Sequence, residues 1–163
     1  MPELTRIETV VHLQSVGLFA YCTAEQVVRM ASIARPHQVT KGERIYSIDD
    51  PAEFLYCLIS GEVELRGRDG SRIVQAPETF GAREILSDHP RAENATALED
   101  TRMLLFEGDD FFDLLSNNMG IVKALFRRLL RPKDLGHTAV DPEAAAGASG
   151  IVPRPQPVES SNP

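Results

Sequence analysis

The sequence predicts a mainly β protein: an antiparallel jelly-roll barrel with helices before and after it. Between residues 37 and 106, short apolar or alternating runs are separated by turn residues at regular intervals. Many short strands at such spacing favour a barrel or jelly roll over a parallel sheet. Apolar residues at helical spacing precede this stretch and return after it, which predicts helices on both sides of the barrel.

Composition and charge are those of a soluble globular protein. The chain is 42% hydrophobic and 25% charged, and it has no apolar run long enough to cross a bilayer. The N-terminal run MPELTRIETVVHL has two early acids and no unbroken apolar stretch, unlike a secretory signal, so we expect a cytoplasmic protein. The formal net charge of −7 argues against a nucleic-acid partner, because phosphate binding requires clustered positive charge.

Two helices are predicted before the barrel, over residues 4–16 and 24–34. The second begins after Thr23, whose hydroxyl has the spacing of a capping box with Gln26. Pro36 prevents that helix from continuing. The predicted buried face of the first helix contains Leu4, Ile7, Val10, Val11 and Leu13, and that of the second contains Val27, Val28, Met30, Ala31 and Ile33.

Short strands make up the predicted barrel. The alternation over residues 62–66 indicates a half-exposed antiparallel strand, and Asp69-Gly70 is a hairpin signal. Cys57 lies inside the apolar run FLYCLI and is predicted to be a buried small hydrophobe. The predicted strands are Gln38–Thr40, Arg44–Ile48, Phe54–Ser60, Glu62–Arg66, Arg72–Gln75, Asn94–Leu98 and Arg102–Phe106.

Helices are predicted again over residues 109–131, where Asp109 or Asp110 is expected to cap the first and Pro132 ends the last. The apolar face of the last helix contains Ile121, Val122, Leu125, Phe126, Leu129 and Leu130. A basic cluster near its end complements the helix dipole or forms a membrane or partner patch: Arg127, Arg128, Arg131 and Lys133.

The chain is therefore expected to form one folded domain over residues 1–132. Residues 133–163 are rich in Ala, Gly, Pro and Ser and contain no aromatic residue, which predicts a disordered tail. Its Pro-x-Pro pieces are capable of docking a partner, although a solvated tail is the simpler interpretation.

Four short motifs occur in the order and approximate spacing found in one known family: Lys41-Gly42-Glu43, Leu-Tyr-x-x-x-Ser-Gly over residues 55–61, Phe80-Gly81 and Pro90-Arg91-Ala92. In these motifs the chain resembles the cyclic-nucleotide-binding domain family. That family includes the bacterial catabolite activators and the regulatory subunits of cyclic-nucleotide-dependent kinases. The resemblance extends from the first helix to about Arg131. It implies a short helix and loop between two strands that cradle a cyclic phosphate.

The resemblance also implies which residues form the ligand site. By position, Gly81 begins the cassette, Arg91 is the phosphate arginine, and Ala92 with the next residue supplies backbone N–H groups. Such chemistry suits an anion, because an arginine adds a charge-assisted and often bidentate contact.

Three positions depart from the family pattern. Ala82 replaces a glutamate that bonds the ribose 2′-hydroxyl, Glu84 lies two positions further on, and Glu93 stands where alanine is usual. We expect Arg91 and Glu93 to project to the same face of a strand, where Glu93 pairs with Arg91 or repels a phosphate.

Two hypotheses about function follow. In the first, the chain is a non-enzymatic regulatory module that acts through protein–protein interaction and has a partly degenerate nucleotide pocket. In the second, it is a sensor of cyclic AMP or cyclic GMP that uses Arg91 and the cassette amides. If that pocket works, Arg91→Ala is expected to leave the melting temperature of the ligand-free domain nearly unchanged.

No catalytic or metal-binding constellation stands out in the sequence. The histidines at positions 12, 37, 89 and 137 lack the short spacings of zinc sites, and the two cysteines complete none. No cofactor is required by either hypothesis, although a cyclic nucleotide is a ligand in the second. Because the last helix stops at Pro132 and a low-complexity tail follows, this chain alone is not expected to read DNA sequence. The oligomeric state is left open.

Overall fold

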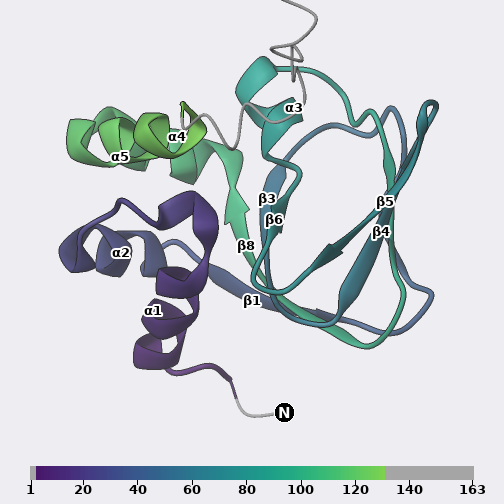
Figure 1. Ribbon diagram of the computed structural model, residues 1–163, viewed down its shortest axis with the longest axis horizontal. Helices are drawn as coiled ribbons and strands as arrows, with labels where there is room; N and C mark the ends of the chain where they lie inside the picture. The colour runs from purple at the N-terminus through teal and green to yellow at the C-terminus, as the bar shows by residue number, and fades with distance from the viewer. Residues whose placement is uncertain (1–2, 131–163) are drawn as a thin grey trace, which may run out of the picture.

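The computed structural model describes residues 3–130, so the predicted tail at 133–163 and the cationic residues Arg131 and Lys133 lie outside the described residues. Within that range a β-barrel lies on one side of the molecule, and the helices that precede and follow it in the chain lie on the other (Figure 1). The predicted order of helices, antiparallel barrel and helices is confirmed.

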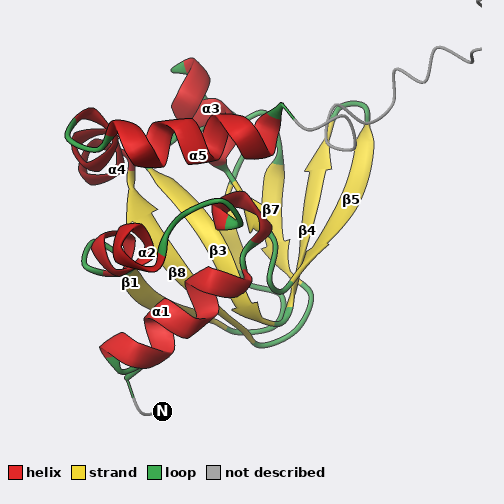
Figure 2. Cartoon of the chain, turned by 60° about the vertical axis from the view of Figure 1, so that its left-hand side comes forward, coloured by secondary structure: helices red, strands yellow, loops and turns green. Residues whose placement is uncertain are grey.

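Two antiparallel sheets of four strands each form the barrel, with the orders β1-β8-β3-β6 and β2-β7-β4-β5. The first sheet contains β1 (Arg35–Val39), β8 (Thr101–Glu107), β3 (Phe54–Ser60) and β6 (Thr79–Phe80). The second contains β2 (Arg44–Tyr46), β7 (Asn94–Ala97), β4 (Glu62–Gly67) and β5 (Gly70–Gln75). Figure 2 shows the helices in front of β1, β8 and β3, so the first sheet separates them from the second.

The strands β3 and β8 are shared by two hydrophobic cores. Successive side chains of a strand point to opposite faces, and on β3 Leu55 and Cys57 belong to a helix-side core, whereas Tyr56 and Leu58 belong to a barrel core between the sheets. Burial on both faces explains why the run FLYCLI is continuously apolar. Cys57 is buried as predicted, and this burial raises the pKa of its thiol.

The second sheet is buried on one face only. On β4, Val63 and Leu65 face the barrel core, while the intervening side chains are more exposed. The β4–β5 hairpin closes with Gly67 opposite Gly70, as Asp69-Gly70 predicted. The apolar pattern of the sequence did not predict the short strand β6.

The N-terminal helices are α1 (Arg6–Ser15) and α2 (Ala24–Ala31), with the 3₁₀ turn η1 (Gly17–Phe19) between them. The predicted capping box is present, because the Gln26 amide donates to the Thr23 hydroxyl at 3.3 Å and the Gln26 side chain accepts from the Thr23 amide at 2.9 Å. The helix ends at Ala31 and not at residue 34, and Pro36 lies within strand β1.

The predicted buried faces of these helices are partly wrong. Ile7 and Val11 are exposed, and Thr9 is buried on α1 together with Leu13. Val28 on α2 is also exposed. Helical spacing allows a wide apolar stripe, and the packing surface under each helix covers only part of it.

The C-terminal helices are α4 (Gly108–Ser116) and α5 (Met119–Leu129). The N-cap of α4 is Glu107 with no side-chain cap bond, so the predicted cap at Asp109 or Asp110 is wrong; both lie in the first turn. Their negative charge there still suits the helix dipole.

Helix α5 packs on η1, where the Arg128 side chain donates through Nε to the Gly17 carbonyl at 2.7 Å. Its opposite face exposes Met119 and Phe126, and Leu129 and the C-cap residue Leu130 are exposed as well. The last three of these were predicted to lie on an apolar packing face, and that prediction is wrong. Among residues 3–130 no helix is both long and apolar enough to span a membrane.

Candidate ligand-binding site

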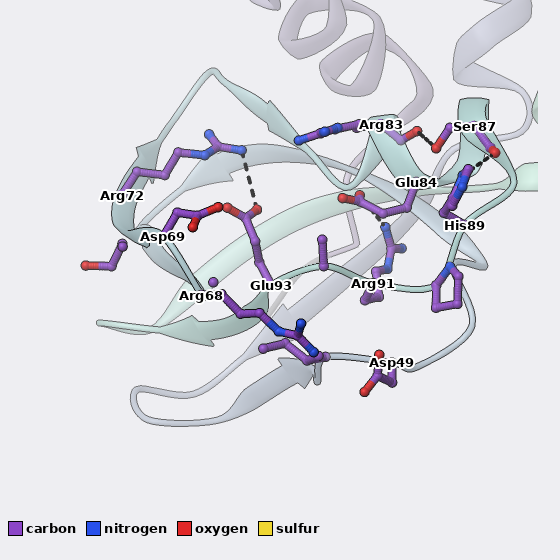
Figure 3. Close-up of a pocket in the computed structure, with 16 residues that line it drawn as sticks. Asp49, Arg68, Asp69, Arg72, Arg83, Glu84, Ser87, His89, Arg91 and Glu93 are labelled. Atoms are coloured by element: carbon purple, nitrogen blue, oxygen red, sulfur yellow. Dashed lines mark hydrogen bonds and ion pairs between the residues drawn. The ribbon is translucent and has the colours of Figure 1, made fainter.

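A cavity of about 740 Å³ lies between the turn of the β4–β5 hairpin, the short helix α3 (Ala82–Ser87) and the segment of residues 89–93 (Figure 3). Glu84, Arg91, Ala92 and Glu93, four of the six site residues taken from the sequence, line it. The helix and loop that the resemblance implied are therefore present, and they border a cavity of the size typical of small-molecule sites.

Gly81 joins strand β6 to α3 in a backbone conformation that favours glycine. Its φ angle is +78°, and a Cβ atom there would lie 2.9 Å from Arg91 Nη1 and 3.0 Å from Tyr56 Cδ2. Glycine is required at this position both for the turn and because the arginine passes directly over it.

Arg91 is turned into the protein. Its side chain is 1% exposed, and its terminal nitrogens donate to two backbone carbonyls: Nη1 to Gly81 at 2.7 Å and Nη2 to Phe54 at 2.5 Å. The guanidinium carbon lies 4.3 Å from the centre of the Tyr46 ring and 5.6 Å from that of Tyr56. The Nε atom is buried without a hydrogen-bond partner. Carbonyls and aromatic faces thus hold most of the guanidinium.

The carboxylate that compensates Arg91 is Glu84. Its Oε2 atom lies 3.5 Å from Arg91 Nη1, and its side chain is 10% exposed. Glu84 projects from the first turn of α3 and is buried against the arginine. The carboxylate two residues after Ala82 therefore contacts Arg91.

Glu93 does not pair with Arg91, and that part of the sequence prediction is wrong. Glu93 Oε2 lies 3.8 Å from Arg72 Nη2 on strand β5. Strand β7 begins only at Asn94, so residues 91–93 lack the regular alternation of a strand. The Arg91 main chain bonds to the turn at residues 49 and 50, with two N–H···O distances of 2.9 Å.

Ala82 offers no polar group where the resemblance implied a ribose contact. It is partly buried and packs against the helix-side core. Ala92, in contrast, lines the cavity beside Glu93. The site residues taken from the sequence are therefore brought close together. Two of them, Arg91 and Glu84, form a buried ion pair, whereas Glu93 forms a more exposed pair with Arg72, which the sequence did not indicate.

The rings below Arg91 are held in a poorly solvated environment. Burial raises the pKa of both Tyr46 and Tyr56, and the positive charge of Arg91 lowers it to a smaller extent. Tyr56 also stacks on Phe80 with ring centres 4.7 Å apart. These rings form an aromatic layer beneath Arg91 that supports the arginine.

Sequence reasoning missed three cationic residues that line the cavity. Arg68 and Arg72 come from the β4–β5 hairpin and Arg83 from α3. The hairpin signal placed Arg68 near a turn but could not show what the turn faces. Among the described residues no group of histidine, cysteine, aspartate or glutamate side chains is arranged to hold a metal ion.

Comparisons with known proteins agree with this fold. The family model for the cyclic nucleotide-binding domain matches residues 36–118, slightly more than half of the chain. The N-terminal domain of a transcriptional regulator from Streptomyces coelicolor A3(2) has a TM-score of 0.65 and 25% identity, and the match covers 78% of this chain and 96% of that domain.

Two curated relatives are similar over most of this chain. A candidate potassium channel protein of Rhodopseudomonas palustris is 25% identical over 114 residues, which cover 68% of this chain and 28% of that protein. A CRP-like cAMP-activated global transcriptional regulator of Mycobacterium tuberculosis is 23% identical over 125 residues, which cover 73% of this chain and 56% of that regulator. This chain therefore spans only part of the length of either relative.

Proposed function

This chain belongs to the cyclic nucleotide-binding domain family. From that premise we propose that it is a regulatory module with a partly degenerate nucleotide pocket, which does not bind a cyclic nucleotide. Its output in this proposal is contact with another protein, without an enzymatic step. A cytoplasmic location and one domain over residues 1–132 are parts of the same proposal.

The observation that carries the proposal is the position of Arg91. Both terminal nitrogens already donate to backbone carbonyls, and Glu84 supplies a negative charge beside them. To bind a phosphate in the cavity, the guanidinium would have to leave these partners and its stack on Tyr46.

The energetic cost of that movement is substantial. A hydrogen bond to a charged group contributes about 1.5–3 kcal/mol, so two of them contribute roughly 3–6 kcal/mol. That range corresponds to about two to four powers of ten in a dissociation constant. A cyclic phosphate would have to recover this free energy before any net binding resulted, and Ala82 supplies no compensating ribose contact.

The outer face of α5 supports a protein partner. Met119, Phe126 and Leu130 are exposed on it, next to the cationic residues Lys123 and Arg127. Exposed apolar side chains gathered on one face commonly mark protein interaction sites. Since this chain spans only part of its curated relatives, we propose that the regulated activity belongs to another domain or protein.

One observation favours the second candidate function, a sensor of cyclic AMP or cyclic GMP. Among the described residues, Arg91 Nε is the sole buried side-chain nitrogen or oxygen without a hydrogen-bond partner. Such atoms are rare in native proteins, and a ligand phosphate is one group that satisfies them. The related mycobacterial regulator is described as cAMP-activated, which is consistent with this alternative.

Calorimetric titration with cyclic AMP and cyclic GMP tests the proposal. We expect no heat of binding up to millimolar nucleotide. We also expect binding to emerge in the double variant Glu84→Ala/Ala82→Glu, because it removes the carboxylate beside Arg91 and restores a ribose contact. The matched control is Glu93→Ala/Ala82→Glu, which leaves the Arg91–Glu84 pair intact and should remain silent.

Micromolar binding by the unmodified chain that is lost in a cooperatively folded Arg91→Lys variant would establish the sensor instead.

The interaction part of the proposal has its own measurement. Proteins recovered with the unmodified chain should be lost with Phe126→Asp and retained with Ile73→Asp, which alters an exposed apolar residue on the barrel.

A further inference from the structure

We propose that the cavity binds a sugar phosphate in which a phosphate monoester lies at the mouth, against Arg72 and Arg83, and sugar hydroxyls lie over the carboxylates of Glu84 and Glu93. This inference goes beyond the proposed function. It assigns a ligand class and an anion site that does not use Arg91.

The charges of the cavity are arranged in layers. The side chain of Glu84 is 10% exposed and that of Glu93 is 30% exposed, whereas that of Arg72 is 60% exposed. Arg68 and Arg83 are likewise exposed. The carboxylates therefore lie deeper than the guanidinium groups that surround the opening.

The mouth arginines are available to a ligand. The side chains of Arg68 and Arg83 make no hydrogen bond or ion pair with any described residue, and the contact of Arg72 with Glu93 is long at 3.8 Å. By contrast, Arg66, on the same hairpin but outside the cavity, lies 2.7 Å from Glu64. Figure 3 shows Arg83 extending from α3 towards Arg72. Guanidinium groups that approach from two elements suit the several oxygens of a phosphate monoester.

The deeper layer determines which end of the ligand enters. The Glu84 and Glu93 carboxylates accept hydrogen bonds and donate none, so they suit hydroxyl groups and repel a phosphate placed beside them. A volume of about 740 Å³ accommodates a sugar phosphate. The phosphate must therefore stay at the mouth, which reverses the orientation that a cyclic phosphate beside Arg91 would need.

The test is calorimetric titration of the full chain with ribose 5-phosphate at low ionic strength, with inorganic phosphate and ribose as fragment probes. We expect a dissociation constant below about 1 mM for ribose 5-phosphate. Arg83→Ala and Arg72→Ala should each weaken it by about ten- to a hundredfold, the loss expected for one charged hydrogen-bonding group. Arg66→Ala is the matched control and should leave the affinity unchanged.

A second variant tests the orientation. Glu93→Gln should reduce the preference for ribose 5-phosphate over inorganic phosphate, because it removes an acceptor for the sugar and also removes repulsion of a bare anion. An unchanged preference overturns the assigned orientation. Absence of heat up to about 10 mM ribose 5-phosphate, or binding that survives both arginine substitutions, overturns the site.

These outcomes are separate from those of the proposed function. Binding of cyclic AMP that requires Arg91 would overturn the proposed function, whereas loss of ribose 5-phosphate binding in Arg83→Ala concerns only the mouth site.

Discussion

Two pairs of an arginine and a glutamate lie in the cavity, one at its floor and one that includes an arginine of its mouth, and they behave differently. In the floor pair, Arg91 and Glu84 are 1% and 10% exposed; in the other pair, the mouth residue Arg72 is 60% exposed and the deeper Glu93 is 30% exposed. A buried charge must be paired and hydrogen-bonded, so Arg91 has become part of the framework. A solvated charge can exchange its partner at little cost, so Arg72 stays free for recognition.

The largest expected effect is on the floor pair. Arg91→Ala leaves Glu84 without its buried partner and the carbonyls of Gly81 and Phe54 without donors, so we expect the free energy of unfolding to fall by about 3–5 kcal/mol. Urea unfolding measures this loss. The sequence analysis predicted that, if the pocket works, Arg91→Ala would leave the melting temperature of the ligand-free domain nearly unchanged. Because Arg91 is buried, we now expect a marked decrease instead.

The matched change at the mouth is Arg72→Ala. Because an exposed ion pair contributes about 0–1 kcal/mol, its unfolding curve should nearly coincide with that of the unmodified chain. Equal losses in the two variants would contradict the distinction between floor and mouth.

A smaller effect is expected where Arg91 crosses the main chain. Gly81→Ala introduces a Cβ atom 2.9 Å from Arg91 Nη1, in addition to the strain of alanine at a φ of +78°. That strain is about 1–2 kcal/mol, and displacing the packed neighbours adds about 1–3 kcal/mol. Gly42→Ala is the control, since its φ is +84° and its Cβ would meet nothing within 4 Å. A larger loss of stability in Gly42→Ala than in Gly81→Ala would refute the close approach.

The smallest effect concerns pH and the rings under Arg91. Burial raises the pKa of Tyr46 and Tyr56 above the ordinary value of 10.0. Above that pH the unfolded chain releases protons that the folded chain retains, so the free energy of unfolding should decrease as the pH rises. Below pH 10 the two hydroxyls are protonated in both states, and the stability is unaffected by their titration. Tyr46→Phe should reduce this slope by up to about 1.4 kcal/mol per pH unit. Denaturant unfolding between neutral and alkaline pH measures it, and an identical slope in the variant would count against the burial of this hydroxyl.

Much of the fold could be predicted because it depends on local pattern. The capping box of Thr23 and Gln26 requires only neighbouring residues, and the hairpin at Asp69-Gly70 requires only its turn. The burial of Cys57 follows from a continuous apolar run. The exposed side chains of Ile7 and Val28 were predicted wrongly because apolar spacing does not show how wide the surface beneath a helix is.

The candidate site was predictable in its position but not in its pairing. The motifs at Phe80-Gly81 and Pro90-Arg91-Ala92 located the cavity. The partner of Arg91 could not be identified, because it depends on where α3 projects Glu84 and on where strand β7 begins. Arg83 and Arg72 face one cavity from separate elements, and nothing in their sequence neighbourhoods indicates this.

The alternation along β3 allows the two sides of this domain to diverge separately. Leu55 and Cys57 meet the helices, whereas Tyr56 and Leu58 meet the barrel interior. A substitution that alters the barrel interior can therefore leave the packing of α1, α2 and α5 intact. A lineage that loses one ligand can in this way keep its outward helical surface, so the history of the pocket and the history of the partner need not coincide.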